Sequence, residues 1–229
     1  MIKIPETDAE IFALMRKELF TAVVGDVLDA AGFTRQFLPP EIRALRGDMI
    51  VVGRAMTVLE ADCFDEEIVV EGAKRPFGHM FRALDDLKPG EVYLCTGSSF
   101  DYALWGELMS TRAMHCGAAG AIVDGFSRDT RGILNLGFPV FSRGTYAQDQ
   151  RVRGRVIDFR CPLSYPNGVR VRCGDILFGD MDGVVVIPQT HLRETVAAAL
   201  EKVHGENKVA TAIRNGMSAQ AAWDAFGIM

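Results

Sequence analysis

Apolar residues near the start of the chain recur at the spacing of amphipathic helices. Within residues 8–20 these positions are Ile11, Leu14, Met15 and Leu19, one helical turn apart. Thr21 is suited to cap a second helix, and Gly32 is suited to end it, because a hydroxyl accepts from free helical N–H groups and glycine adopts left-handed backbone readily. The pattern therefore predicts two short helices before the first strand.

In the middle of the chain, apolar runs of strand length alternate with segments of helical spacing. The predicted strands cover residues 49–59, 92–96, 121–124 and 139–142. The predicted helices cover residues 78–87, 103–116 and 130–136. This alternation is typical of parallel strands joined by helical crossovers. The fold class that we expect is therefore α/β.

Three arginines then alternate with other residues at the two-residue period of a strand. They are Arg151, Arg153 and Arg155, and on one face of a strand they would form a positively charged stripe. Such a stripe is compatible with RNA contact or with a solvated or interface face. We favour the second interpretation and expect no nucleic-acid partner, since the net charge is −5 and nucleic-acid binders carry a basic patch.

The C-terminal part is predicted to form hairpins and then helices. Asp180 and Asp182 stand just before Gly183, and without the full EF-hand spacing they favour a tight hairpin over a calcium loop. Residues 190–215 are predicted to be helical, and Ser218 is expected to cap a last short helix. We expect one domain over residues 1–229, with a helical extension from about residue 190.

Composition excludes several classes of protein. The hydrophobic and charged fractions, 48% and 24%, are ordinary for a globular domain. The five cysteines include no CxxC pair, and the four histidines form no HxH or HExxH pattern, so a disulfide framework or a zinc site is not expected. The chain has no nucleotide-binding glycine loop, no apolar signal core and no run long enough to span a membrane. We expect a cytoplasmic location and no membrane contact.

The most informative stretch is an apolar strand that stops at Asp124-Gly125 and soon presents Arg128 beside Asp129. Ligands of α/β proteins gather where strands end. Arginine binds carboxylates with a forked guanidinium, and aspartate with water holds hard cations. The pair therefore indicates a site for an anionic, oxygen-rich molecule polarised by a metal, with an incidental surface ion pair as the alternative.

A second turn adds to this hypothesis. Gly106 and Glu107 open a predicted helix, where glycine permits close approach and the free N–H groups attract anions. Glu107 is a candidate acid or base, or a first-turn acid that only favours the helix dipole. Together with Arg128 and Asp129, it is expected on two neighbouring strand-to-helix turns.

An ordered series of motifs makes the interpretation more specific. The motifs are Gly106-Glu107-Leu108-Met109-Ser110-Thr111, Val123-Asp124-Gly125-Phe126-Ser127-Arg128-Asp129, Phe138-Pro139-Val140-Phe141-Ser142-Arg143-Gly144, Gly174-Asp175 and Gly179-Asp180-Met181-Asp182-Gly183 followed by Val184-Val185-Val186-Ile187-Pro188. The series resembles the family that groups 4-hydroxy-4-methyl-2-oxoglutarate aldolases with regulators of ribonuclease activity. It covers most of the chain.

The resemblance implies a fold, an activity and roles for matched residues. The implied fold is the layered β/β/α swivelling domain, with N- and C-terminal helices. The implied activity is that of a class II pyruvate aldolase: Asp129 matches the ligand of Mg²⁺ (or Mn²⁺), and Arg128 matches the arginine that binds the pyruvyl group. The backbone of residues 106–109 (Gly106, Glu107, Leu108 and Met109) matches the turn that receives the pyruvyl carboxylate. Glu107 departs from the aspartate usual in the aldolases, and Asp129 is typically lost in the regulators.

The resemblance also implies an assembly and leaves alternatives. Family members form trimers or dimers of trimers, and Glu206 resembles a glutamate that a neighbouring subunit contributes, although a surface acid fits equally. The expected partner is a small 2-oxo acid, cleaved to pyruvate, with oxaloacetate decarboxylation as a side activity. The alternatives are a non-catalytic protein-binding regulator and an aldolase for a sugar-derived 2-keto acid. Phe77, His79, Lys74 and Arg75 are loose candidates for lining the pocket beyond C4.

Overall fold

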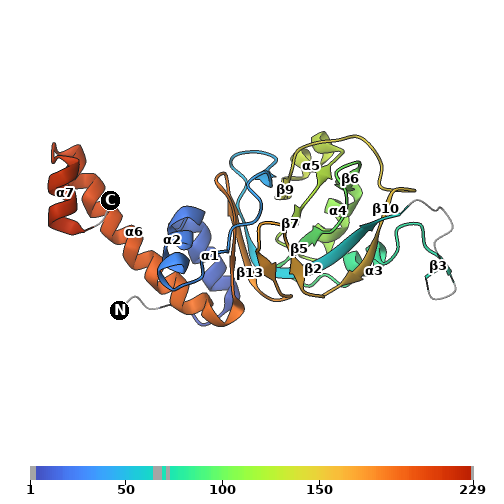
Figure 1. Ribbon diagram of the computed structural model, residues 1–229, viewed down its shortest axis with the longest axis horizontal. Coiled ribbons are helices and arrows are strands. Elements are labelled where there is room, and N and C mark those ends of the chain that lie inside the picture. Colours follow the sequence, from blue (N-terminus) through green and yellow to red (C-terminus); the bar gives the residue numbers. More distant parts are fainter. Residues whose placement is uncertain (1–3, 64–68, 71–72, 228–229) are drawn as a thin grey trace.

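A computed structural model describes residues 4–63, 69–70 and 73–227 (Figure 1). The helices are α1 (Asp8–Glu18), α2 (Thr21–Ala30), α3 (Met80–Asp85), α4 (Glu107–His115), α5 (Thr130–Leu136), α6 (Leu192–Arg214) and α7 (Ala219–Phe226). The strands of the main sheet are β1 (Arg43–Ala44), β2 (Val51–Asp62), β5 (Glu91–Thr96), β7 (Gly120–Val123), β9 (Val140–Ser142), β10 (Gly154–Phe159), β13 (Ile176–Asp180) and β14 (Gly183–Ile187). Shorter pairs are β3 (Val69–Val70) with β4 (Ala73–Lys74), β6 (Ala103–Trp105) with β8 (Phe126–Ser127) and β11 (Leu163–Ser164) with β12 (Arg170–Val171).

The main sheet has the order β1-β9-β7-β5-β2-β13-β14. Strands β9, β7, β5 and β2 are parallel, whereas β1, β13, β14 and β10 pair antiparallel with their neighbours. Leu38 donates to the carbonyl of Val184, and Val186 donates to the carbonyl of Gln36, so the segment before β1 runs along β14. The ends of the sheet thus meet in a nearly closed barrel. The expected α/β class with terminal helices is confirmed.

Alternate residues of the parallel strands enter different cores. In β5, Val92 and Leu94 belong to the cluster inside the barrel, whereas Tyr93 and Cys95 belong to the cluster under α3, α4 and α5. A third cluster lies between the sheet and the helices α1, α2 and α6. Figure 1 shows these two groups of helices on opposite sides of the sheet. The two-residue period of a strand therefore supplies both faces with apolar side chains.

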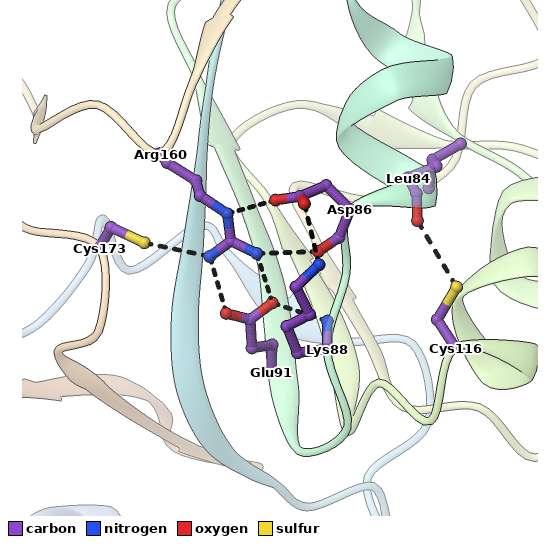
Figure 2. A network of polar contacts seen from close by, with 7 residues as sticks. All are labelled: Leu84, Asp86, Lys88, Glu91, Cys116, Arg160 and Cys173. Atoms are coloured by element: carbon purple, nitrogen blue, oxygen red, sulfur yellow. Dashed lines mark hydrogen bonds and ion pairs between the residues drawn. The ribbon is translucent and has the colours of Figure 1, made fainter.

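Arg160, just after β10, ties that strand to the turn between α3 and β5 (Figure 2). Its two Nη atoms donate to the Glu91 carboxylate at 2.8 and 2.9 Å, and Nη2 also donates to the Asp86 carbonyl at 2.9 Å. Nε donates to the Asp86 carboxylate. The hydrogen bonds to Glu91, followed by those to Asp86, raise the pKa of Arg160. This forked contact fixes the start of β5.

Two predictions from the sequence were wrong in detail. The predicted helix over residues 103–116 begins only at Glu107, because Ala103–Trp105 is a strand that pairs with β8. The arginine stripe does not form, because residues 151–153 make a turn in which Val152 has a φ of 66°. Only Arg155 lies on a strand, so no basic face results.

The predicted hairpin and the predicted helices of the C-terminal part are confirmed. Asp180 and Gly183 pair across the β13–β14 hairpin, and Ser218 caps α7 through its side chain. Figure 1 shows α6 extending from the body of the molecule, with α7 packed near its far end. Within the described residues, no helix is long and apolar enough to cross a membrane.

Candidate active site

The parallel pair β6–β8 brings two helix starts side by side. Ala103 pairs with Phe126, and Trp105 pairs with Ser127. Strand β6 leads through Gly106 into α4, and β8 leads through Arg128 and Asp129 into α5. The Arg128 N–H donates to the Trp105 carbonyl at 2.8 Å. The expectation of two neighbouring strand-to-helix turns therefore matches the structure.

Asp129 is held at the point where these turns meet. Its φ of 57° and ψ of 32° are left-handed, a conformation that aspartate tolerates better than most residues. The Glu107 N–H approaches Oδ2 of Asp129 at 3.3 Å. A β-carbon on Gly106 would lie 2.7 Å from the same oxygen. The absence of a side chain at Gly106 is therefore what lets the carboxylate lie against the start of α4.

Arg128 lies between two carboxylates. Its Nη1 is 2.9 Å from Oδ1 of Asp149, and its Nε is 3.8 Å from Oδ2 of Asp129. These side chains are all partly exposed, with relative exposures of 37%, 42% and 45% for Arg128, Asp149 and Asp129. One cation facing two acids leaves an excess of negative charge, which favours a bound cation.

Buried polar contacts underneath fix the loop that carries Arg128. Asp124 accepts from the Thr96 hydroxyl at 2.6 Å and from Nε of Arg143 at 2.7 Å. The hydroxyls of Ser127 and Ser142 are 3.2 Å apart. Residues of the motif Val123–Asp129 thus contact residues of the motif Phe138–Gly144 through their side chains, at the ends of β7 and β9.

A cavity of about 460 Å³ opens beside these residues, within the range of ~300–1,000 Å³ typical of small-molecule sites. Its polar end is formed by Arg128, Asp129, Asp149 and Gln150, next to Gly106. Leu108 and Met109 from the first turn of α4 also line it, as does Phe77, a loose candidate from the sequence.

Glu107 has a different position from the one expected of an acid in the site. Its carboxylate lies against Gly132 of α5, and Glu107 is not among the residues that line the cavity. Only its backbone N–H faces Asp129. The N–H groups of the first turn of a helix lack partners inside the helix, so the turn at residues 106–109 offers donors to an anion.

Glu206 lies on α6, where its carboxylate is 3.9 Å from Nζ of Lys202. Figure 1 shows α6 on the opposite side of the sheet from α4 and α5. Glu206 therefore does not join the site of its own chain. The hypothesis that it serves a neighbouring subunit stays a prediction.

Sequence reasoning missed three residues near the cavity. Asp149 was overlooked because no motif contains it.

Gln150 donates through Nε2 to Oε2 of Glu60 at 2.8 Å, and Glu60 is 1% exposed. Desolvation raises the pKa of Glu60 to about 8, while the hydrogen bond from Gln150 opposes the shift. A glutamate near the end of the mostly apolar strand Val51–Asp62 is the signal that could have found it.

Among the residues that the structure describes, no group of three or more histidine, cysteine, aspartate or glutamate side chains is placed to hold a metal ion. Any cation at Asp129 would therefore take most of its ligands from water or substrate oxygens. Mg²⁺ is commonly bound in this way, through one or two carboxylates with several waters retained.

The family model described as "RraA-like: Aldolase/RraA" matches residues 21–186. The matched region contains both helix starts and the whole polar end of the cavity. The chain belongs to the RraA-like family.

Several known proteins are similar to this chain over most of its length. A protein of Halalkalibacterium halodurans named "Putative 4-hydroxy-4-methyl-2-oxoglutarate aldolase" is 30% identical over 95% of the chain and 96% of its own length. Protein DlpA of Legionella pneumophila is 30% identical over 88% of the chain, which spans only 31% of that relative. The crystal structure of an uncharacterised protein from Pseudomonas syringae has a TM-score of 0.82 at 25% identity, covering 99% and 98% of the two chains.

Proposed function

We propose that this RraA-like protein is a divalent-metal-dependent aldolase that cleaves a 4-hydroxy-2-oxo acid to pyruvate and a second carbonyl compound. The observation that carries the proposal is the meeting of Arg128, Asp129 and the start of α4 at the polar end of one cavity. The aldolase names of relatives such as the H. halodurans protein support the same chemistry.

The residues present fit a divalent cation. Asp129 offers a partly exposed carboxylate, and the excess of acid over base around Arg128 favours a positive charge. When bound by Asp129, Mg²⁺ or Mn²⁺ would act as a Lewis acid toward the 2-oxo acid.

Different groups of the protein would bind the substrate carboxylate and stabilise the developing charge. The free N–H groups at the start of α4, in Leu108 and Met109, receive the substrate carboxylate. Arg128 donates to the 2-oxo oxygen, where negative charge develops as the C3–C4 bond breaks. A donor fixed in this position stabilises the transition state more than the ground state. The same contact would serve oxaloacetate decarboxylation, which we propose as a side activity.

A base must take the proton of the 4-hydroxyl, and a proton must later reach C3 of pyruvate. Glu107 is one candidate, acting through water because its carboxylate lies at Gly132. Asp149 is the second candidate, since its carboxylate lines the cavity beside Arg128. Glu107→Gln and Asp149→Asn separate the two candidates, because loss of the general base lowers kcat by about 10²–10⁴-fold, whereas loss of the other carboxylate has a smaller effect.

The test is pyruvate release from 4-hydroxy-4-methyl-2-oxoglutarate and from oxaloacetate, with Mg²⁺, with Mn²⁺ and with EDTA. We expect chelator-sensitive release from both substrates and its loss in Asp129→Asn, which keeps the size of the side chain and tolerates the left-handed backbone. Release from neither substrate, in protein shown to be folded by circular dichroism, would favour the non-catalytic regulator instead.

We also propose assembly as a homotrimer or homohexamer, with Glu206 reaching a neighbouring site. Light scattering after gel filtration gives the mass, and Glu206→Gln tests the contribution. A monomer with full activity, or an unchanged Glu206→Gln oligomer with unchanged kinetics, would contradict this arrangement.

A further inference from the structure

The cavity has two chemically different ends. Beyond Arg128 and Asp129, side chains from α3, α4 and the strand before α4 form an apolar wall. These residues are Phe77, Met80, Phe81, Leu84, Leu104, Leu108 and Met109. The few atoms of a pyruvyl group occupy only a small part of about 460 Å³, so the apolar wall faces whatever the substrate carries beyond C4.

Among the described residues that line the cavity, the two cations, Arg112 and Arg128, are paired with acids. Arg128 lies against Asp149, and Nε of Arg112 in α4 is 2.8 Å from Oδ1 of Asp85 in α3, a pair that joins the two helices and also lines the cavity. A second carboxylate on the substrate would therefore leave water for an apolar wall without gaining an unpaired cation. Burial of an ion under such conditions is unfavourable. A polyhydroxylated chain would likewise lose hydrogen bonds to water there.

Two apolar side chains at this wall are open to solvent. Phe81 is 59% exposed, and Leu108 is 84% exposed. The rings of Phe77 and Phe81 lie edge to face, with centroids 5.6 Å apart. Covering these groups with an apolar or aromatic ligand group removes their surface from water and continues the aromatic packing.

We infer that the natural substrate carries an uncharged, apolar group at C4, of aryl or branched alkyl type, seated between α3 and α4. This inference rests on the proposed aldolase function and specifies its substrate class. It disfavours both a second carboxylate and a sugar-derived chain at this position.

The cleavage of such a substrate is balanced without a further reagent. The C3–C4 bond breaks, the 4-hydroxyl loses its proton to a base, and C4 leaves as an aldehyde carbonyl. The electron pair of the broken bond stays on the pyruvyl part, which takes up one proton at C3 to give pyruvate.

The experiment compares pyruvate release from 4-hydroxy-2-oxo-4-phenylbutanoate, 4-hydroxy-4-methyl-2-oxoglutarate, a 2-keto-3-deoxy sugar acid and oxaloacetate. We expect kcat/KM for the phenyl substrate to exceed that for the dicarboxylate and the sugar acid by about tenfold or more, since even one methylene group in an apolar pocket contributes a factor of ~10–200. Comparable or reversed values would overturn the inference while leaving the aldolase function standing. Release from none of the four, oxaloacetate included, would instead contradict the proposed function.

Two variants of the exposed Phe81 test whether the preference for the phenyl substrate comes from the cavity wall or only from a higher intrinsic reactivity of that substrate. Phe81→Ala should raise KM for the phenyl substrate several-fold more than KM for the dicarboxylate. Phe81→Arg should lower kcat/KM for the phenyl substrate and raise it for the dicarboxylate, a pair of opposite changes that partial unfolding cannot produce. Met181→Ala, at an exposed apolar side chain of the β13–β14 hairpin outside the cavity, is the control and should change neither. Parallel changes for both substrates in the Phe81 variants would overturn the inference.

Discussion

The carboxylate of Glu107 occupies the space next to Gly132 that a β-carbon at position 132 would fill. Glu107 is the first residue of α4, and Gly132 lies in the first turn of α5. A glycine inside a helix costs about 0.5–1 kcal/mol relative to alanine. The close approach of Glu107 is the structural reason for a glycine at this position.

This contact predicts coupling between the two positions. Gly132→Ala should stabilise the protein by about 1 kcal/mol more in a Glu107→Ala background than in the wild type, because alanine is the better helix former once the carboxylate is gone. Urea unfolding of the wild type, both single variants and the double variant measures the coupling. Equal effects of Gly132→Ala in the two backgrounds would show that the carboxylate does not rest there.

Gly106→Ala should impair the site more than the fold. The backbone at Gly106 is extended, with φ of −148° and ψ of −177°, so alanine adopts it without strain. Its β-carbon would nevertheless meet Oδ2 of Asp129 at 2.7 Å and displace that carboxylate. We expect kcat/KM for Mg²⁺-dependent pyruvate release to fall by about tenfold or more, and the Mg²⁺ concentration for half activity to rise. Gly47→Ala is the matched control, since its nearest neighbour is 3.9 Å away, and it should behave as wild type.

Glu60 should make stability depend on pH. Its ordinary pKa of 4.5 is raised to about 8 in the folded protein by burial. Between these pH values the unfolded chain has released the proton and the folded chain has kept it. Rising pH therefore favours unfolding, by about 1.4 kcal/mol per pH unit at most. The contribution is fully present below the unfolded pKa and is lost as the pH rises through the folded one.

Glu60→Gln isolates this effect, because glutamine has the same shape and can still accept from Gln150. Urea unfolding at a series of pH values should show the wild type losing stability relative to Glu60→Gln between about pH 5 and pH 8. Parallel pH profiles would mean that Glu60 is ionised in the folded protein.

Arg160 should stabilise the fold through its forked hydrogen bonds to Glu91 and Asp86 rather than through its charge alone. Arg160→Met removes the guanidinium from Glu91, whose side chain is only 14% exposed, and leaves its carboxylate with the N–H of Lys88. We expect a loss of about 1–3 kcal/mol of unfolding free energy. Arg160→Lys is the control: it keeps the charge and the left-handed backbone of 57° but cannot bind both carboxylate oxygens and Asp86 together, so it should lose less. Wild-type stability of Arg160→Lys would show that the positive charge alone is sufficient and that the forked hydrogen bonds contribute nothing.

The local pattern of apolar and polar residues was sufficient to predict most of the helices and strands. Periodicity predicted α1, α2, α5 and the strands at Glu91–Thr96 and Val140–Ser142 within one or two residues. The predicted cap at Thr21 was wrong, because Thr21 is the first residue of α2 and its hydroxyl donates to Asp180 instead. The pattern failed at Ala103–Trp105 because a three-residue strand has no periodicity of its own and exists only by pairing with β8. It failed at Arg151 and Arg153 because alternation alone cannot distinguish a strand from a turn.

The α/β class, the family and the place of Arg128 and Asp129 at a strand end were predictable from the sequence, because they follow from local periodicity and from residues close together in the chain. The set of groups that share the cavity became known only from the packing of the helices and strands. This packing turned Glu107 toward Gly132, brought in Asp149 and Gln150, and set the apolar wall of α3 opposite α4. Those positions depend on contacts between segments that are distant in sequence, and the energies of such contacts leave no local pattern.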